Sequence, residues 1–169
     1  MLRNLLAASA ALSIAACAHA PPPAAAPDAS LSPQARWEQG QKAYLAWNGQ
    51  RRGWTTTPSG LQHRKLKAAP ASSPRPEPGA TVTIHYTGTF IDGREFDSSR
   101  TRGEPATFPL NRLIKGWQEG VPLMRVGERW LFVIPAHLAY GDRTDRDPIP
   151  PGSTLIFDIE LIAIPGEDS

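Results

Sequence analysis

The fold is decided by a stretch of alternating residues that runs into a tight turn: His85-Tyr86-Thr87-Gly88-Thr89-Phe90-Ile91-Asp92-Gly93-Arg94-Glu95-Phe96-Asp97-Ser98-Ser99-Arg100. From Thr81 to Phe90, the alternation puts Val82, Ile84 and Tyr86 on one face, which is typical of a half-buried strand. Asp92-Gly93 is a strong hairpin signal, so the chain is expected to return as a second strand. The stretch therefore predicts an antiparallel hairpin.

Further short strands and one short helix are predicted around this hairpin. Residues 128–134 are nearly all apolar, as in a central strand, and residues 154–164 alternate again. The other predicted strands are residues 61–67 and 107–110. A short helix capped by Asn111 would turn one apolar stripe toward the sheet: Leu113, Ile114, Trp117 and Val121. The fold class is therefore α+β, a mostly antiparallel sheet wrapped around one short helix.

Residues 1–17 are predicted to be an export signal. Their apolar run, Leu5 to Ile14, is shorter than the roughly 20 residues that span a bilayer. The run ends in Ile14-Ala15-Ala16-Cys17, which resembles a bacterial lipobox, so lipidation is expected at Cys17. The chain would then be anchored by lipid in the cell envelope, at the outer membrane and facing the periplasm. The alternative is an ordinary secretory signal that is cut after Ala18 or Ala20.

Two segments separate this signal from the strands. Residues 18–31 are rich in alanine and proline and are expected to form an extended tether. Residues 32–53 are expected to hold one amphipathic helix, from Pro33 to Asn48, with Ser32 as its cap. Its aromatic stripe could pack on its own domain or on a second copy of the chain, so a homodimer is possible.

Composition argues against several classes of function. The formal charge is only +2, with no basic stripe and no nucleic-acid module, so nucleic acid is not an expected partner. The single cysteine excludes an internal disulfide. The four histidines lack metal-ligand spacing, so no metal site is predicted. A hydrolase has no support, because no serine or cysteine has a recognisable base partner nearby.

Four motifs in order resemble the signature of the FKBP-type peptidyl-prolyl isomerases, the tacrolimus-binding immunophilins. They are the stretch quoted above, Ile114-Lys115-Gly116-Trp117, Leu138-Ala139-Tyr140-Gly141 and Ile149-Pro150-Pro151-Gly152-Ser153-Thr154-Leu155-Ile156-Phe157-Asp158. The resemblance implies an isomerase domain at residues 54–165, followed by a tail at 166–169. Thr57-Pro58-Ser59-Gly60-Leu61-Gln62 is similar to the bacterial Mip-like branch, whose members often place a helix, and sometimes a dimer interface, before the catalytic domain.

The resemblance implies catalysis of rotation about X–Pro peptide bonds during the folding of exported proteins. Amide resonance opposes this rotation with a barrier of about 18–20 kcal/mol. Because no covalent bond is made or broken, the catalyst needs only a cleft that prefers the twisted amide, and neither cofactor nor metal is expected. Expected ligands are proline-containing unfolded or exported polypeptides and tacrolimus-like macrolides. The alternative is an envelope-tethered chaperone or binding module that uses the same cleft with little turnover.

By the same resemblance, an aromatic cleft holds the proline ring. Trp117 would be its floor and Leu113 its rim, and its walls would be Tyr86, Phe96, Ile114 and Phe157. Phe108 is a further expected substrate contact, and Ile149 would cover one side from a loop. Taken singly, each aromatic residue would also suit a core, but the order and spacing of the whole set favour the cleft.

The resemblance also assigns polar groups. Asp97 and Tyr140 would lie on the carbonyl side of the bound peptide. Arg102 stands where the residue in family members commonly pairs with the acidic residue and the tyrosine. The backbone N–H of Ile114 would anchor the peptide. The chain departs from the family pattern at Ala106, where some members carry an aromatic wall, and in the charged loop 142–148, where Asp145 replaces a common histidine.

Overall fold

The computed structural model describes residues 30–143, 145 and 147–166. Cys17, the predicted export signal, most of the predicted tether and the last three residues lie outside this part of the chain. Helix α1 (Pro33–Gly49) comes first, with the side chain of Ser32 accepting a hydrogen bond from the N–H of Ala35. Among the described residues, no helix is long and apolar enough to cross a membrane.

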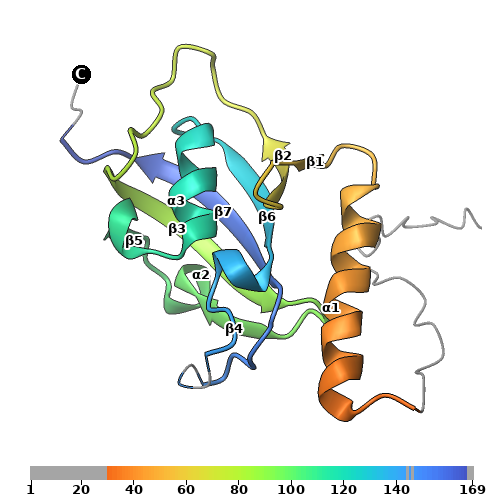
Figure 1. Ribbon diagram of the computed structural model, residues 1–169. Helices are drawn as coiled ribbons and strands as arrows, with labels where there is room; N and C mark the ends of the chain where they lie inside the picture. The colour runs from red at the N-terminus through yellow and green to blue at the C-terminus, as the bar shows by residue number, and fades with distance from the viewer. Residues whose placement is uncertain (1–29, 144, 146, 167–169) are drawn as a thin grey trace, which may run out of the picture.

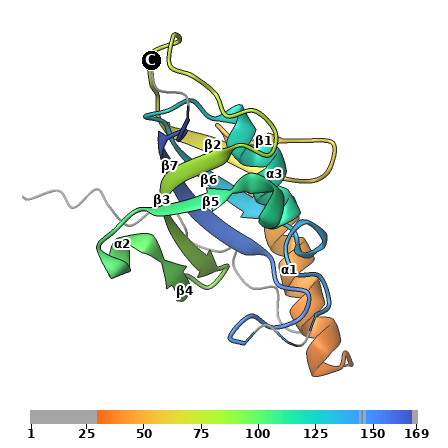
Figure 2. The ribbon, with the colours of Figure 1, turned by 90° about the vertical axis from the view of Figure 1, so that its left-hand side faces the viewer.

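One sheet of seven strands follows α1 and wraps around a short helix, α3 (Figures 1 and 2). The strand order is β1-β2-β6-β7-β3-β4, with β5 also paired to β3, and all pairs are antiparallel. This arrangement confirms the predicted α+β class. The elements after α1 are β1 (Thr55–Thr56), β2 (Gln62–Lys67), β3 (Thr81–Phe90), β4 (Glu95–Ser98), α2 (Ser99–Arg102), β5 (Ala106–Pro109), α3 (Lys115–Gly120), β6 (Arg129–Ile134) and β7 (Leu155–Ala163), with 3-10 turns η1 (Leu110–Arg112), η2 (Val121–Leu123) and η3 (Ala136–Leu138).

The predicted hairpin joins β3 to β4. Gly93 turns the chain with a φ of 89°, a conformation that glycine adopts without strain. The N–H of Phe90 donates to the carbonyl of Arg94 at 2.9 Å and closes the turn. The hairpin fixes which side chains of β3 and β4 share a face, and it thereby places Tyr86 and Asp97 in one site.

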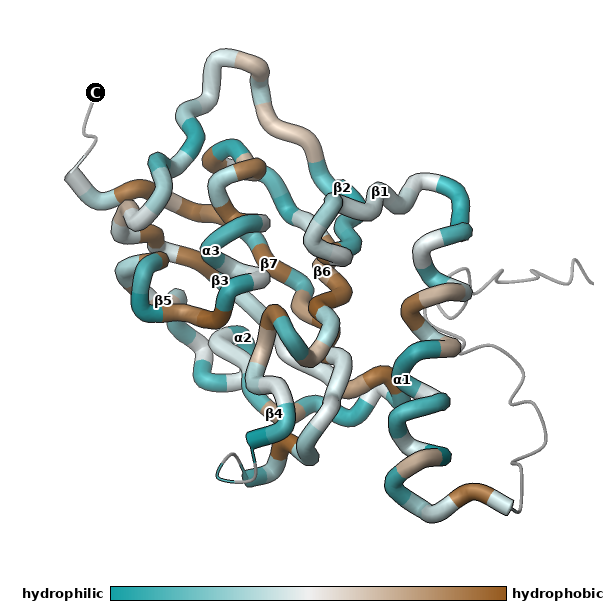
Figure 3. The backbone as a smooth tube through the Cα atoms, viewed as in Figure 1, coloured by the Kyte–Doolittle hydropathy of each residue, from teal (hydrophilic) through white to brown (hydrophobic). Residues whose placement is uncertain are grey.

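The main core lies between the sheet and α3. Alternate residues of β3, β6 and β7 point into it, and hydrophobic residues lie along these strands (Figure 3). Helix α3 approaches the sheet closely because Gly116 and Gly120 face it. A Cβ at Gly116 would lie 2.5 Å from Ile134, and one at Gly120 would lie 2.5 Å from Phe132. This approach brings Trp117, which is 5% exposed, down onto the strands.

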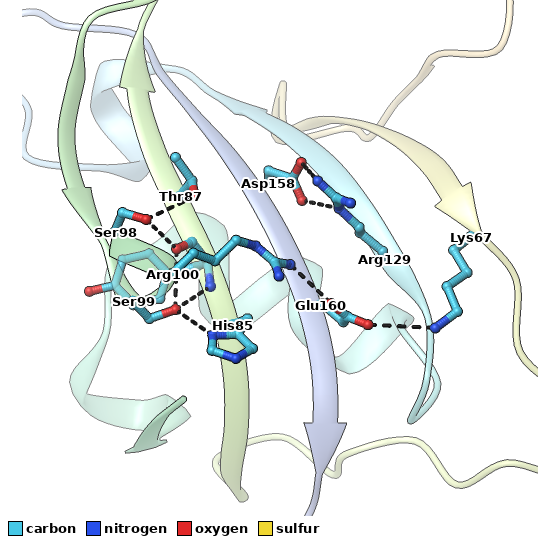
Figure 4. Close-up of polar contacts among 10 residues, drawn as sticks. Lys67, His85, Thr87, Ser98, Ser99, Arg100, Arg129, Asp158 and Glu160 are labelled. Carbon is cyan, nitrogen blue, oxygen red and sulfur yellow. Dashed lines mark hydrogen bonds and ion pairs between the residues drawn. The ribbon is translucent and has the colours of Figure 1, made fainter. Parts of the chain in front are cut away.

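The other face of the sheet is shared between α1 and a layer of ion pairs. Tyr44 of α1 packs with Leu131, Val133 and Ile156 in a second apolar cluster. Beyond this cluster, Glu160 of β7 pairs with both Arg100 and Lys67, and Arg129 forms two bonds of 2.7 Å to Asp158 (Figure 4). These charged side chains occupy part of the face that α1 does not cover, and Ile162, which follows Glu160 on this face of β7, is 37% exposed.

Polar side chains attach α1 in addition to the predicted aromatic stripe, of which Tyr44, Leu45 and Trp47 pack on the domain. The helix is largely hydrophilic (Figure 3), and two of its three buried residues are the amides Gln41 and Asn48. The Oε1 of Gln41 accepts a hydrogen bond from the N–H of Thr154, and the Nδ2 of Asn48 donates one to the Oε1 of Gln62, both at 2.8 Å. The helix is therefore fixed to its own domain by buried hydrogen bonds as well as by Tyr44.

The predicted cap of the short helix is wrong. Asn111 lies inside the 3-10 turn η1, and α3 begins only at Lys115, with Ile114 in the capping position and no side-chain cap. The backbone is extended at Leu113 and Ile114, between η1 and α3, so the turn that contains Asn111 does not continue into the helix. Two short elements, β1 and α2, were not predicted.

Candidate active site

An open cleft of about 560 Å³ lies over Trp117. Strands β3, β4, β5 and β7, the segment from η1 to α3 and the loop after η3 all contribute to it. Its lining is aromatic at the centre and polar at the edge: Tyr86, Phe96, Asp97, Phe108, Arg112, Leu113, Ile114, Lys115, Trp117, Gln118, Ala139, Tyr140, Arg143 and Phe157.

The aromatic side chains of the cleft hold one another edge to face. The ring centroids of Trp117 and Phe157 are 5.1 Å apart at 88°, and those of Tyr86 and Trp117 are 5.2 Å apart at 78°. Phe96 meets Phe157 at 5.6 Å and 90°. Such pairs are each worth roughly 0.5–1.5 kcal/mol beyond their buried area. The walls are therefore fixed before any ligand arrives.

The wall formed by Phe96 and Phe157 depends on the absence of a side chain at Gly88. This residue lies within β3, opposite Asp97 on β4 and Phe157 on β7. A Cβ at Gly88 would lie 2.7 Å from Phe96 and 2.9 Å from Phe157. Glycine weakens a strand interior. At this position, however, its lack of a side chain lets the rings of Phe96 and Phe157 pack directly against the backbone of β3.

A hydrogen-bond network surrounds the carboxylate of Asp97 at the edge of the aromatic cluster. The hydroxyl of Tyr86 donates to Oδ2 of Asp97 at 2.5 Å. The guanidinium of Arg102 donates to Oδ1 of Asp97 and, at 2.9 Å, to the Tyr86 hydroxyl oxygen. We call these three residues the Asp97 network. Helix α2, which carries Arg102, is held by the side chain of Ser98, whose Oγ accepts from the N–H of Thr101.

The Asp97 network keeps its acid charged and its tyrosine protonated. Burial alone would raise the pKa of Asp97, but the hydrogen bonds from Tyr86 and Arg102 outweigh it, and the pKa lies below its usual value. Burial and the bond to Asp97 raise the pKa of Tyr86. The cleft thus presents one fixed negative charge beside an aromatic surface.

The structure brings most of the predicted site residues together. The four residues Tyr86, Phe96, Trp117 and Phe157 line one cleft, as do Asp97, Phe108, Leu113, Ile114 and Tyr140. Arg102 lies outside the lining but binds Asp97. Ile149 packs on the core and does not line the cleft, and Ala106 is likewise packed against the core. The loop contact of Ile149 with a bound peptide stays a prediction.

Four polar lining residues were not predicted: Arg112, Lys115, Gln118 and Arg143. All four are exposed, and an exposed polar residue leaves no periodic signal in a sequence. Their positions beside Ile114, Trp117 and Tyr140 were the available clue. Arg143 belongs to the charged loop and forms a two-bond ion pair with Asp145, at 2.7 and 2.9 Å.

Over residues 30–143, 145 and 147–166, no group of three or more His, Cys, Asp or Glu side chains is placed to hold a metal ion. What the cleft offers a ligand is an aromatic surface, one fixed carboxylate and a polar edge.

Comparison with known proteins defines the class to which this fold and cleft belong. The sequence model of the FKBP-type peptidyl-prolyl cis-trans isomerases matches residues 73–162, and the chain belongs to this family. It is 50% identical over 123 residues to the isomerase FkpA of Aeromonas hydrophila, covering 72% of this chain and 44% of that protein. It is 44% identical over 122 residues to the "Outer membrane protein MIP" of Legionella longbeachae, covering 72% of this chain and 52% of that protein.

Solved structures agree with this result. A peptidyl-prolyl cis-trans isomerase from Pseudomonas syringae pv. tomato aligns with a TM-score of 0.71 and 30% identity, over 80% of this chain and 98% of that one. These relatives confirm the resemblance to the family and to its bacterial Mip-like branch. The chain spans about half the length of the two named relatives, 44% and 52%.

Proposed function

We propose that this protein is a peptidyl-prolyl cis/trans isomerase that accelerates rotation about X–Pro bonds in exported polypeptides. The observation that carries the proposal is the edge-to-face aromatic cluster over Trp117, with the charged Asp97 fixed at its edge. Family membership supports the same activity.

The proposed mechanism needs no nucleophile or proton transfer. Twisting the X–Pro amide removes its resonance, so charge separation across the amide falls on the way to the transition state. A cleft lined by rings favours this less polar state over the planar forms, and only such a differential preference accelerates the reaction. Trp117 would support the proline ring, and Asp97 and Tyr140 would lie on the carbonyl side. The backbone N–H of Ile114, on the cleft wall, would orient the peptide.

A protease-free isomerisation assay on a Leu-Pro or Phe-Pro peptide tests this proposal. We expect Trp117→Ala to lower kcat/KM at least tenfold, because it removes the floor of the cleft. Asp97→Asn should lower it about ten- to a hundredfold, since hydrogen bonds to charged groups contribute about 1.5–3 kcal/mol and each 1.4 kcal/mol is a factor of ten. Asp92→Asn is the matched control, because Asp92 is an exposed acid of the β3–β4 turn that pairs with Arg94. Wild-type turnover in both Trp117→Ala and Asp97→Asn would refute the assignment.

The same variants separate the isomerase from a tethered chaperone with little turnover. A chaperone would suppress aggregation of an unfolded client equally well before and after Asp97→Asn. An isomerase would lose most of its acceleration of proline-limited refolding in Asp97→Asn. Tacrolimus should compete with the peptide for the cleft, and competition titrations on the wild-type protein measure this. Sedimentation of the full chain would test whether it forms a homodimer.

We also propose that the protein is held in the cell envelope by lipid on Cys17, at the outer membrane and facing the periplasm. Support comes from the lipobox resemblance and from a relative that is named an outer membrane protein. Fractionation of cells that express the full chain tests the anchor. Cys17→Ser should move the protein from the membrane to the periplasmic fraction, and unchanged membrane association would contradict the proposal.

A further inference from the structure

The edge of the cleft is positively charged. Three of its lining residues are cations, Arg112, Lys115 and Arg143, and the only acid among the lining residues is Asp97. Two of the cations flank Ile114, because η1 ends at Arg112 and α3 begins at Lys115. The third follows Tyr140 in the loop. The cations of the lining therefore come from two segments, the η1–α3 segment and the loop after Tyr140.

The partners of these charged groups decide how much of this charge a ligand would meet. Asp97 is already paired with Arg102, and Arg143 is paired with Asp145. Within the described part of the chain, no ion pair is formed by Arg112 or Lys115. The surplus charge of the cleft is therefore positive, and Arg112 and Lys115 carry it.

We propose that this cleft selects polypeptide segments in which an aspartate or glutamate stands close to the proline. The proposal rests on the proposed function and adds a substrate class to it. The aromatic cluster takes the proline, and Arg112 and Lys115 attract the acidic neighbours as the chain leaves the cleft. Complementary charges at the rim of a binding site chiefly speed association and disfavour ligands of like charge. Segments with lysine or arginine beside the proline are therefore disfavoured.

An exposed cation is ordinarily just solvated, so the expected effect is modest. An ion pair between exposed groups corresponds to roughly a one- to fivefold change in an equilibrium constant. Two such pairs should together give about three- to tenfold between acidic and neutral neighbours. The effect must shrink with added salt, because the screening length falls from about 30 Å at 0.01 M to about 8 Å at 0.15 M. This salt dependence separates charge attraction from packing.

The test uses three peptides that share a central Leu-Pro and carry glutamate, glutamine or lysine on both sides of it. Calorimetry measures the affinity of each peptide for the full chain at low and at physiological salt, and the isomerisation assay measures kcat/KM. Affinity should fall in the order glutamate, glutamine, lysine. In Arg112→Gln/Lys115→Gln, the glutamate-to-lysine ratio should approach one. In the control Arg52→Gln/Lys42→Gln, which removes two exposed cations outside the lining, the ratio should persist.

The two proposals fail in different ways. Equal affinity for the three peptides, or a preference that survives in Arg112→Gln/Lys115→Gln, would overturn the acidic preference. A clear preference in binding with no acceleration of any peptide would overturn the isomerase assignment and leave the preference standing. Circular dichroism confirms that each double variant is folded.

Discussion

Gly88→Ala should damage both the stability and the activity of this protein, although it adds only one methyl group. The methyl would lie 2.7 Å from Phe96 and 2.9 Å from Phe157. Carbon atoms pack best at about 3.5–4.0 Å, so each ring would have to retreat by roughly 0.6–1.3 Å. Neither ring is free to do so, because Phe96 and Phe157 contact each other edge to face and Phe157 also contacts Trp117.

Overpacking of this kind costs about 1–3 kcal/mol of folding free energy. For a domain of this size, each kcal/mol lowers Tm by roughly 3–6 °C, so a fall of about 3–18 °C is expected. Because the displaced rings are walls of the cleft, kcat/KM should also fall at least tenfold at a temperature where the variant remains folded. Thermal unfolding followed by circular dichroism and the isomerisation assay measure the two effects.

Gly40→Ala is the matched control. Gly40 lies within α1, and an added Cβ there would have no heavy atom within 4 Å. Alanine is favoured over glycine in a helix by about 0.8–1.0 kcal/mol, so this variant should unfold at the wild-type temperature or above it. A Gly88→Ala protein as stable and active as wild type would refute the packing argument, as would an equal loss in Gly40→Ala.

Three further predictions address the acid, a histidine and the N-terminal helix. Tyr86 and Arg102 lower the pKa of Asp97, so the carboxylate should stay charged and kcat/KM for a neutral peptide should be constant between about pH 5 and pH 8. A fall in kcat/KM toward acid pH with its midpoint in that range would contradict the network. Burial beside Trp130 lowers the pKa of His63. Below about pH 6.5 the imidazole of His63 is therefore protonated more readily in the unfolded chain than in the folded state. Unfolding in urea should therefore become easier as the pH falls from about 7.5 to 5.5, and the drop should be smaller in His63→Gln. Gln41→Leu leaves the buried N–H of Thr154 without its acceptor and should cost about 1–3 kcal/mol in urea unfolding, whereas the exposed Gln34→Leu should cost little.

Much of the fold could be predicted because its strands alternate. The hairpin from β3 to β4 followed from alternation and from Asp92-Gly93, and the bounds of β6 and β7 followed from their apolar residues. Helix α3 was harder to place, because the cap at Asn111 was inferred from residue type, whereas the backbone first forms a 3-10 turn. Helix α2 had an unused signal: Ser98 caps its start and Gly103 ends it in a left-handed conformation.

The candidate site also has a part that the sequence predicted and a part that only the structure revealed. Its aromatic members belong to motifs of fixed spacing, and the structure brings them into one cleft. For Arg112 and Lys115, the only clue in the sequence was their position beside Ile114 and Trp117, because exposed cations leave no periodic pattern. The attachment of α1 was also hidden, because Gln41 and Asn48 are polar and a hydrophobic pattern counts them as surface. Only tertiary contact reveals that each has a buried partner.

The Asp97 network fits a reaction without proton transfer better than acid–base catalysis. A carboxylate beside an aromatic cluster costs free energy unless it is paired, and here Tyr86 and Arg102 pair with both oxygens. A general acid or base works best with a pKa near the operating pH, and the same pairing moves the pKa of Asp97 the opposite way. The network instead holds one charge in a fixed place. Rotation of an amide makes and breaks no covalent bond, so a fixed field and an apolar surface can act on the loss of charge separation that accompanies the twist.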